Sequence, residues 1–511
     1  MRKFCSTALL CLTFGAQAGV IIPNLPDPCT LQTHNGSIRT VLLAEGGNVP
    51  SIPYGALYVE ASVERSLPGP AELVVITNGN SYSWGDYQAL AHFLARNGFI
   101  VVVAERYNNT GTDPMIVYDA IFDAFGELPL TIENTSIVML GHSRGGGVVH
   151  DAARLNTDAG SPFDVSAVIT LAPHVGESVG LVGADTPSYL TIYGSRDQDM
   201  AGSTGYPRES FAAYDRSGTE GSTTCNSPPC ILWQPLIDRT MVYIHGADHP
   251  GLIGLPTDLY PESEFVAPSD QACLTRGYVN GFLRWKLRGQ TVYQDLLRGK
   301  VRPPTWNSIT SSQADGLGNP AGSAVRIGFQ SSPAQRKVIE NFEDGSISLA
   351  YLSNGITGSI TQQGQYPTAP RRIRHVTRAL RLLWPNSNSY QYIGLNVPSA
   401  ASIGSTYSHL SVRIGPLFGE PGRDNPINQD LEIWVGLGDA STTRWARLYD
   451  YGTILRTDLS NGGGRSAMNT IQVPLSAFNG LDQDDIQRVY FAFPPGHTGA
   501  VLIDSIEWVR D

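Results

Sequence analysis

Residues 136–155 constrain the fold more than any other part of the 511-residue chain. A continuous apolar run over 136–140 leads into Gly141-His142-Ser143-Arg144-Gly145-Gly146, and a helix-like segment follows over 145–155. A strand, a glycine-bounded turn and a helix in this order form an elbow whose strained backbone projects a serine oxygen into the open. The glycines let the strand and the helix approach closely. The sequence therefore predicts a buried strand, a tight turn that presents Ser143, and a helix.

Buried strands alternate with helical segments on both sides of this turn. Strands are expected at 73–77, 99–104, 136–140, 165–171, 189–193 and 240–244, and helices at 86–97, 115–125, 145–155 and 271–287. Continuous apolar strands are typical of a sheet that is covered on both faces. Two strand-like pieces within 37–60 indicate an antiparallel edge. The alternation predicts an α/β fold, with a doubly wound and mostly parallel sheet.

The pattern of apolar and polar residues changes after residue 298. Residues 299–336 include Arg302-Pro303-Pro304 and many small polar residues without an apolar period, which indicates a linker. Beyond it, short strands with period-two alternation are expected at 410–414, 431–435, 470–473, 489–493 and 501–503. This pattern is typical of an all-β sandwich. We therefore expect an α/β domain over 19–298, a linker over 299–336 and a β-sandwich over 337–511.

The first 18 residues are expected to be an export signal. Arg2 and Lys3 precede a short apolar run, and Ala16-Gln17-Ala18 matches a small-residue cleavage site. No other stretch is apolar and long enough to span a bilayer. These features predict a secreted protein, extracellular or periplasmic, without a membrane span.

Four cysteines follow the expected signal: Cys29, Cys225, Cys230 and Cys273. In an oxidising compartment an even number predicts two disulfides, and four cysteines allow three connectivities. The short loop from Cys225 to Cys230 contains two prolines and favours a bond between its ends, which leaves Cys29 for Cys273. Zinc is the alternative, but the spacing is not that of a zinc site.

The composition bears on the kind of partner. The chain has 35 Lys and Arg against 46 Asp and Glu, a formal net charge of −11. Phosphate binding needs a basic surface, so this balance argues against nucleic acid.

A serine hydroxyl needs a base to become a nucleophile, and the base needs a carboxylate to fix its tautomer. In the elbow architecture the partners follow in the order Ser, acid, His, each after a later strand. Asp197 follows the strand at 189–193, with Asp199 as the alternative acid. His249 lies in the loop after the next strand. We predict Ser143 as the nucleophile, Asp197 or Asp199 as the acid and His249 as the base.

Two other histidines lie near these segments. His245 is at the end of the strand at 240–244, where a packed and hydrogen-bonded ring is expected. His150 lies two turns along the helix after Ser143 and is expected to face away from the turn. His249 is therefore the preferred base.

The oxyanion that forms during acyl transfer needs two hydrogen-bond donors. One is expected to be the backbone N–H of Arg144, next to Ser143. The other is expected from the loop after the strand at 73–77, where Gly79 lets the backbone approach and the N–H of Asn80 is the donor. Three nearby side chains are candidates for contacting the substrate: Tyr82, Trp84 and His174.

Residues 50–290 resemble the α/β-hydrolase superfamily, above all its secreted lipase, chlorophyllase-like and cutinase-like polyester-hydrolase branches. The block 74–106, the Gly-His-Ser-Arg-Gly-Gly motif, Gly194-Ser195-Arg196-Asp197 and Gly246-Ala247-Asp248-His249 carry the resemblance. At the oxyanion loop this chain has Asn78-Gly79, where many such enzymes have His-Gly.

The resemblance implies a serine hydrolase that cleaves carboxylic esters of a lipid, a polyester or an acylated sugar. It further implies a Ser-His-Asp triad, an acyl-enzyme and no catalytic cofactor. A serine peptidase or another enzyme on the same fold is the alternative, and a non-catalytic binding protein is a second one.

The C-terminal part is similar to galactose-binding-like jelly-roll modules, as found in carbohydrate-binding domains. The segments 341–345 (Asn-Phe-Glu-Asp-Gly) and 502–506 (Leu-Ile-Asp-Ser-Ile) carry this likeness. It implies a domain that docks on a glycan or polymer surface. It also implies a structural Ca²⁺ held by Glu340, Asp344 and Asp504, whose oxygens are ligands that Ca²⁺ prefers.

Overall fold

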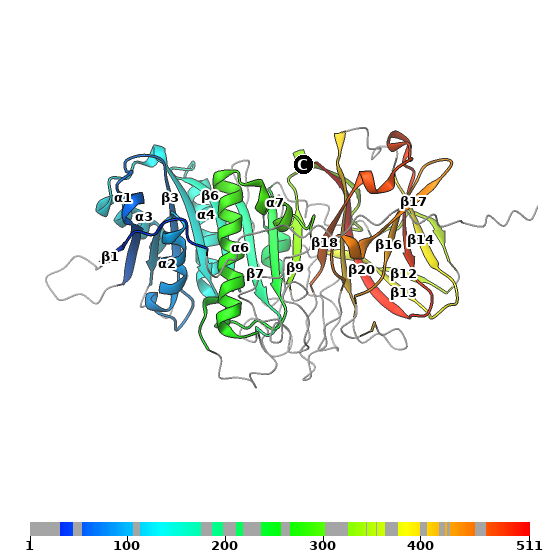
Figure 1. Cartoon of the computed structure of the whole chain (residues 1–511), viewed down its shortest axis with the longest axis horizontal. Helices are drawn as coiled ribbons and strands as arrows, with labels where there is room; N and C mark the ends of the chain where they lie inside the picture. The colour runs from blue at the N-terminus through cyan, green and yellow to red at the C-terminus, as the bar shows by residue number, and fades with distance from the viewer. Residues whose placement is uncertain are drawn as a thin grey trace, which may run out of the picture.

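The computed structural model describes most of the chain. The described residues are 31–43, 54–105, 113–174, 187–197, 211–217, 237–256, 266–301, 325–343, 345–353, 355–362, 377–398, 406–417, 425–426, 430–454 and 467–510. Figure 1 shows helices and a large sheet in the N-terminal half and strands in the C-terminal half. The expected signal, residues 1–18, lies outside the described residues.

A nine-stranded mixed sheet forms the centre of the N-terminal half. Its strands are β1 (Ile38–Leu43), β2 (Gly55–Glu60), β3 (Ala71–Thr77), β4 (Ile100–Ala104), β5 (Thr135–His142), β6 (Asp164–Leu171), β7 (Ser188–Gly194), β8 (Arg239–Ile244) and β9 (Val325–Gln330), in the order β1-β2-β4-β3-β5-β6-β7-β8-β9. The six strands from β4 to β8 are parallel to one another, and β1, β2 and β9 are antiparallel to their neighbours. The expected parallel sheet and its antiparallel β1–β2 edge are confirmed.

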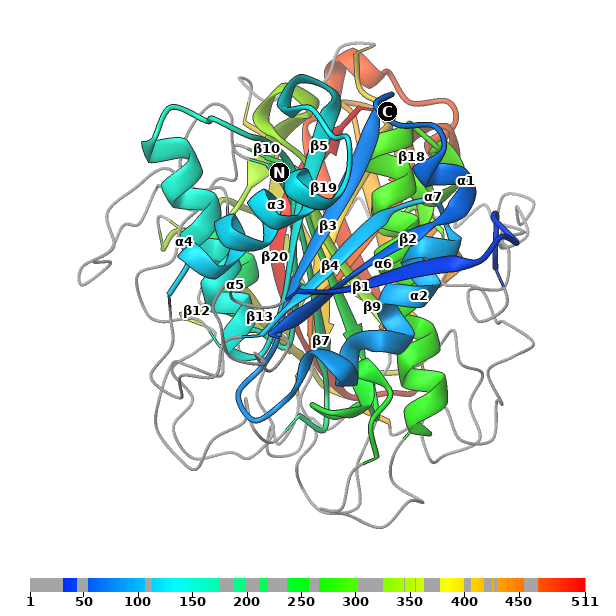
Figure 2. The ribbon, with the colours of Figure 1, turned by 90° about the vertical axis from the view of Figure 1, so that its left-hand side faces the viewer.

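Helices cover both faces of this sheet, as Figure 2 shows from its β1 end. The described helices are α1 (Ala61–Glu64), α2 (Gln88–Arg96), α3 (Met115–Glu127), α4 (Arg144–Asp158), α5 (Ala212–Arg216), α6 (Pro268–Arg288) and α7 (Thr291–Leu297). Val74 and Ile76 of β3 share one core with α2, α6 and α7, whereas Leu73 and Val75 share another with α3 and α4. Successive side chains of a strand point to opposite faces, so the continuous apolar strands supply two cores.

The segment 299–336 is not only a linker. It contains β9, which pairs with β8, and the start of β10 (Arg336–Glu340). Every residue of β9 is buried: its apolar side chains share a core with helix α7, and its backbone bonds to side chains of β18 in the C-terminal half. The linker prediction was therefore wrong for 325–336, while residues 302–324 lie outside the described part of the chain.

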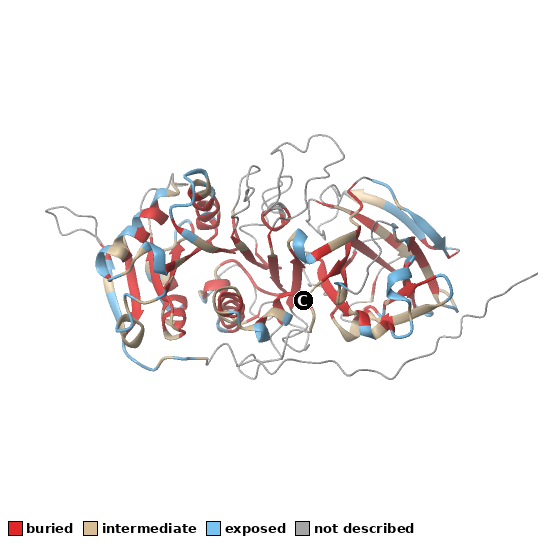
Figure 3. Ribbon diagram, turned by 90° about the horizontal axis from the view of Figure 1, so that it is seen from above, coloured by how far each residue is buried: buried red, intermediate tan, exposed pale blue. Residues whose placement is uncertain are grey.

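The C-terminal half is built from two β-sheets around one apolar core. One sheet has the order β12-β13-β20-β15-β18, with β10 also paired to β20, and the other has the order β11-β14-β19-β16-β17. The strands are β11 (Leu349–Leu352), β12 (Thr357–Gln362), β13 (Arg378–Trp384), β14 (Gln391–Asn396), β15 (His409–Pro416), β16 (Trp434–Gly438), β17 (Thr443–Arg447), β18 (Asn469–Pro474), β19 (Arg488–Phe493) and β20 (Gly499–Val509). Figure 3 shows the buried layers of this half and of the α/β half. The predicted β-sandwich texture is confirmed, and β16 begins three residues later than expected.

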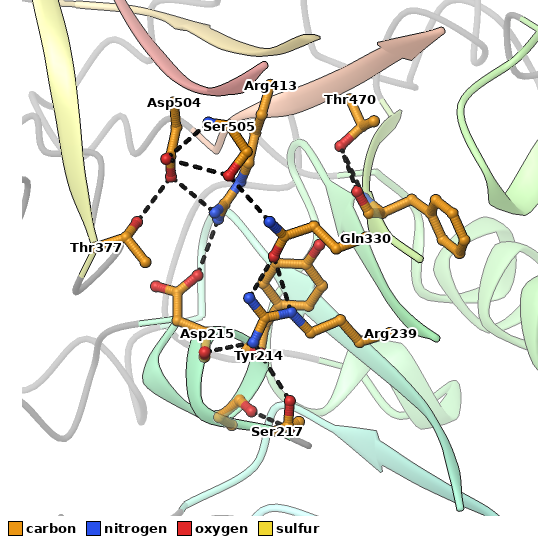
Figure 4. Close-up of polar contacts among 12 residues, drawn as sticks. Tyr214, Asp215, Ser217, Arg239, Gln330, Thr377, Arg413, Thr470, Asp504 and Ser505 are labelled. Carbon is orange, nitrogen blue, oxygen red and sulfur yellow. Dashed lines mark hydrogen bonds and ion pairs between the residues drawn. The ribbon is translucent and has the colours of Figure 1, made fainter. Parts of the chain in front are cut away.

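Buried polar side chains join the two halves (Figure 4). Arg413 of β15 contacts Asp215 of α5 and Asp504 of β20, each at 2.9 Å, and all three side chains are at most 2% exposed. Gln330 of β9 donates to Ser505 of β20 at 3.0 Å and accepts a hydrogen bond from Arg239 of β8. A charge that is buried without a partner is costly. The folded state therefore depends on Arg413 staying paired with both carboxylates.

Asp504 is also one of the three expected calcium ligands. Its Oδ2 accepts hydrogen bonds from Arg413 at 2.9 Å and Thr377 at 2.8 Å, so a cationic group already occupies that oxygen. Glu340 accepts from the backbone N–H groups of Asn341 and Phe342, and Asp344 lies outside the described residues. Among the described residues no three His, Cys, Asp or Glu side chains are grouped as metal ligands. The hydrogen bonds that Asp504 and Glu340 already accept do not favour calcium binding there. The calcium site stays a prediction.

Two further expectations concern the N-terminal half. Cys273 is buried in α6 and is disulfide-bonded, whereas Cys29, Cys225 and Cys230 lie outside the described residues, so the connectivity stays a prediction. No helix in the described part of the chain is both long and apolar enough to cross a membrane.

The buried carboxyl of Glu343 makes stability depend on pH. Burial, and next the negative charge of Asp504, raise its pKa from 4.5 to about 8. Between these values an unfolded chain loses the Glu343 proton while the folded protein keeps it, so this group lowers stability as pH rises from about 4.5 to about 8. We predict that Glu343→Gln flattens this fall and raises the melting temperature above that of the wild type at pH 8.5, but much less at pH 5.

Thermal unfolding at several pH values measures the effect. Glu432→Gln changes an exposed glutamate of the same sandwich and is the control, which should follow the wild-type curve. Parallel pH curves for Glu343→Gln and the wild type would contradict the prediction.

Candidate active site

The predicted nucleophile lies on a strained turn between β5 and α4. Ser143 has φ 54° and ψ −122°, a conformation that non-glycine residues rarely adopt. Its N–H donates to the carbonyl of Leu171 at 2.9 Å, and its carbonyl accepts from the N–H of His174 at 2.8 Å. These two bonds come from the end of β6 and the loop after it, and they hold the strained residue on both sides.

Two glycines make room for this turn. A Cβ on Gly141 would lie 2.1 Å from the carbonyl oxygen of Gly145, and a Cβ on Gly145 would lie 2.5 Å from that of Thr77. Both distances are far below van der Waals contact, so a side chain at either position would displace backbone. The glycines of the motif therefore allow β3, β5 and α4 to meet at Ser143.

The predicted acid and base lie together. Asp197 follows β7, His249 follows β8, and Asp197 Oδ2 is 2.9 Å from His249 Nδ1. Asp197 is 1% and His249 2% exposed, so water weakens this contact little. The alternative acid, Asp199, lies outside the described residues.

Backbone hydrogen bonds fix the two loops that carry Asp197 and His249. The N–H of Ser195 donates to Ile244, the N–H of Arg196 donates to Ala247, and the N–H of Gly246 donates to Ser195 Oγ at 2.7 Å. The loops are thus bonded to each other directly before the acid and the base. This pairing brings two residues that are 52 positions apart into contact.

The other two histidines occupy different positions. His150 is buried in α4, where its Nε2 is 3.0 Å from the hydroxyl of Tyr189. His245 is 1% exposed at the end of β8. The pKa of both rings is lowered to about 3, by burial in His150 and by burial together with the charges of Arg326 and Arg196 in His245. His249 contacts Asp197.

The loop expected to supply an oxyanion donor lies against Ser143. A Cβ on Gly79 would lie 2.8 Å from Cβ of Ser143, and Asn78 Nδ2 donates to the carbonyl of Tyr82 at 2.5 Å. Asn80 is exposed beside this contact. Arg144, the expected source of the other donor, begins α4.

The three expected substrate-contacting side chains differ in position. The ring centroid of Tyr82 is 6.3 Å from that of His249 and 5.1 Å from that of His142. Trp84 is half-buried against the α/β core, and its backbone N–H donates to the carboxylate of Glu105 at 2.7 Å. His174 is half-buried and bonded through its backbone to Ser143. The ring of Tyr82 therefore lies beside the predicted base.

A groove lies next to the loop that carries His249. It has a volume of about 360 Å³ and is lined by η1 (Trp84–Tyr87), α2, η4 (Gly251–Ile253) and α6. Leu90, Leu252 and Ile253 supply apolar walls, and Asp86 and Arg276 supply charge.

Sequence reasoning missed two residues of the site. Tyr87 ends η1 (Trp84–Tyr87), and its hydroxyl is 2.8 Å from Nδ1 of His142, the residue before Ser143. His142 Nε2 in turn is 3.2 Å from the carbonyl oxygen of His249. The histidine inside the motif was a signal for this contact, but nothing in the sequence pointed to Tyr87.

Comparisons with known proteins give only weak likenesses. No family model and no curated protein matches the chain. Among solved structures, a family 11 carbohydrate-binding module from Clostridium thermocellum, solved with a mixed-linked tetrasaccharide, is 13% identical, with a TM-score of 0.24 over 34% of this chain and 96% of the module. Esterase B from Lactobacillus rhamnosis is 14% identical, with a TM-score of 0.25 over 33% of this chain and 70% of the esterase. At such scores the function has to be argued from the site itself.

The contact between Gly79 and Ser143 can be tested. We predict that Gly79→Ala slows labelling of Ser143 by a fluorophosphonate at least tenfold, because the methyl group would push the loop 78–82 off the serine; a displacement of about 1 Å can cost a factor on the order of 100. Gly126→Ala is the control, since a Cβ there meets nothing within 4 Å. Equal labelling rates for both variants would disprove the close contact.

Proposed function

We propose that the chain is a serine hydrolase that cleaves carboxylic esters. The observation that carries the proposal is the strained turn at Ser143, at the same sheet edge as the buried contact between Asp197 and His249. The carboxyl ends of parallel strands meet at one edge of a sheet, which is where α/β proteins bind their ligands. Ser143, Asp197 and His249 all follow such ends.

In the proposed reaction Ser143 Oγ attacks the ester carbonyl carbon while His249 Nε2 takes the hydroxyl proton. Asp197 accepts the Nδ1–H of His249 and stabilises the imidazolium. The backbone N–H groups of Arg144 and Asn80 donate to the oxyanion. The alcohol leaves with the proton from His249, and water then releases the acid by the same steps in reverse.

The proposed substrate is a neutral ester of a lipid, a polyester or an acylated sugar. Tyr82 offers an aromatic face beside His249, and the groove along Leu90, Leu252 and Ile253 offers apolar surface. We further infer that the protein is exported, because residues 1–18 have the pattern of a signal and Cys273 is disulfide-bonded.

We predict that Ser143→Ala abolishes turnover of p-nitrophenyl butyrate while the fold is kept, as judged by circular dichroism. Asp197→Asn should lower kcat by a factor on the order of 10³ to 10⁴, because the base then loses its correct tautomer. Asp199→Asn is the matched control and should retain most of the activity. Cleavage of a peptide panel without ester turnover would instead identify a peptidase, and an active Ser143→Ala would exclude both.

We also propose that the β-sandwich docks on a linear glycan, through an aromatic row on the outer face of its five-stranded sheet. Across the strands this row reads Tyr351, Gly394, Tyr490, Gly436 and Trp445 in register. Their neighbours along the strands, such as Val435 and Phe491, point into the core, so the row faces outward.

The glycines leave room for the rings of the neighbouring strands to pass over them. A Cβ on Gly394 would lie 2.6 Å from Tyr490, and a Cβ on Gly436 would lie 2.8 Å from Trp445. The rings of Tyr490 and Trp445, two strands apart in register, lie 5.8 Å apart, centroid to centroid, and form one aromatic surface that suits the apolar faces of sugar rings. Tyr351 is 45% exposed, and its ring stacks on that of Tyr392 at 4.8 Å.

We predict that Trp445→Ala and Tyr490→Ala each weaken binding to insoluble polysaccharide about tenfold, without changing turnover of a soluble ester. Pull-down with a panel of insoluble glycans measures the bound fraction. Phe122→Ala removes an aromatic ring that is 58% exposed on α3 and is the control. Unchanged glycan binding in both variants, or binding to polyester film alone, would refute the glycan proposal.

A further inference from the structure

A chain of hydrogen bonds connects the loop beside Ser143 to the backbone of His249. The N–H of Gly79 donates to the hydroxyl oxygen of Tyr87 at 2.8 Å, and this oxygen is 2.8 Å from His142 Nδ1. His142 Nε2 is 3.2 Å from the carbonyl oxygen of His249. Tyr87 and His142 are both 0% exposed, so no bulk water competes for these contacts.

The direction of each bond follows from the atoms involved. A carbonyl oxygen can only accept, so the proton on His142 is on Nε2 and is donated to His249. Burial and the neighbouring His249 hold the pKa of His142 well below 6.5, so the ring carries a single proton and Nδ1 is an acceptor. Tyr87 therefore donates its hydroxyl proton to Nδ1 and accepts the N–H of Gly79. Burial raises the pKa of Tyr87 well above 10, which keeps this hydroxyl protonated.

These bonds have a consequence for the two elements they join. The Gly79 N–H is already used, so it does not point at a substrate oxyanion, and the neighbouring Asn80 N–H is left for that role. At the other end, the His142 ring lies 4.5 Å from the His249 ring, centroid to centroid, with 35° between their planes. His249 is thus held through its backbone and along its ring, while Asp197 holds its Nδ1.

We propose that Tyr87 and His142 are positioning residues that hold the oxyanion loop and the base His249 in fixed register with Ser143. The inference rests on the proposed ester hydrolysis, for which the loop supplies a donor and His249 moves the proton. Neither residue touches the substrate. His142 directly precedes Ser143, so the link also joins the loop and the base to the strained turn. A neutral His142 adds no positive charge beside the imidazolium that forms on His249.

Tyr87→Phe is the sharpest test, because it removes one oxygen and with it two hydrogen bonds while the buried ring stays. We expect kcat for a small soluble ester to fall about 10- to 100-fold with KM changed less than about threefold, since the loop and the base are displaced and not the binding surface. Tyr58→Phe is the control: Tyr58 is equally buried in the same half, and its hydroxyl has no hydrogen-bond partner in the described part of the chain.

His142 variants separate positioning from packing. Glutamine can present one acceptor and one donor as the ring does, whereas leucine presents neither, so kcat should fall in the order wild type, His142→Gln, His142→Leu. The double variant Tyr87→Phe with His142→Leu should lose less activity than the product of the two single losses, because the two residues share one hydrogen bond. Equal kcat for Gln and Leu variants, or wild-type kcat for Tyr87→Phe, would overturn the proposal.

A measurement without substrate tests the positioning role independently of the proposed ester hydrolysis. In protein labelled with ¹⁵N-histidine, the His142 signals, assigned by their loss in His142→Gln, should report the neutral Nε2–H tautomer from pH 5 to 9. A protonated His142 or an Nδ1–H tautomer would contradict the hydrogen-bond directions even if ester turnover is found. If the wild type cleaves no ester, the proposed function fails, and the rate of fluorophosphonate labelling in Tyr87→Phe still decides the positioning role.

Discussion

The close approach of three backbone segments at Ser143 is the constraint on which the site depends. Gly141 lies near the end of β5, Gly145 lies in the first turn of α4, and Thr77 ends β3. Their main chains come so close that no Cβ fits between them. The positive φ of Ser143 is unfavourable by itself, on the order of 1 to 3 kcal/mol, and the main-chain bonds to Leu171 and His174 offset it. The strain is thus held by β6 and its loop, elements outside the motif.

The parallel sheet brings the predicted acid and base to the same edge as this turn. Because β5, β7 and β8 run in the same direction, the loops that follow them emerge at one edge. The loops after β7 and β8 then bond to each other, which places Asp197 in contact with His249. The chain Gly79–Tyr87–His142–His249 adds the loop after β3 to the same arrangement. Four strand ends are therefore connected by hydrogen bonds between main chain and buried side chains.

The sequence predicted the features that depend on local residue patterns. The six parallel strands are mostly apolar segments, and the loops that follow three of them carry Ser143, Asp197 and His249. Position after a strand indicated Ser143 and His249 and left Asp197 and Asp199 as alternative acids. Tyr87 could not be found this way, because its role depends on a contact with His142 across 55 residues. The strand β9 was missed for a related reason. Its residues alternate between apolar and polar, but they lie beyond a proline-rich stretch. They form a strand of this sheet because they pair with β8, a contact that the local sequence does not indicate.

The position of β9 also defines how the two halves depend on each other. An edge strand exposes unpaired N–H and C=O groups, and proteins cover such edges. Here β18 covers it with side chains: Asn469 accepts the N–H of Ile327, and the hydroxyl of Thr470 accepts the N–H of Phe329 and donates to its carbonyl. Removing residues 337–511 would expose this edge and leave Asp215 buried without Arg413, so such a truncation would disturb the α/β half as well. The role of the sandwich is therefore better separated by substitutions on its outer face, which leave β9, β18 and the buried ion pairs in place.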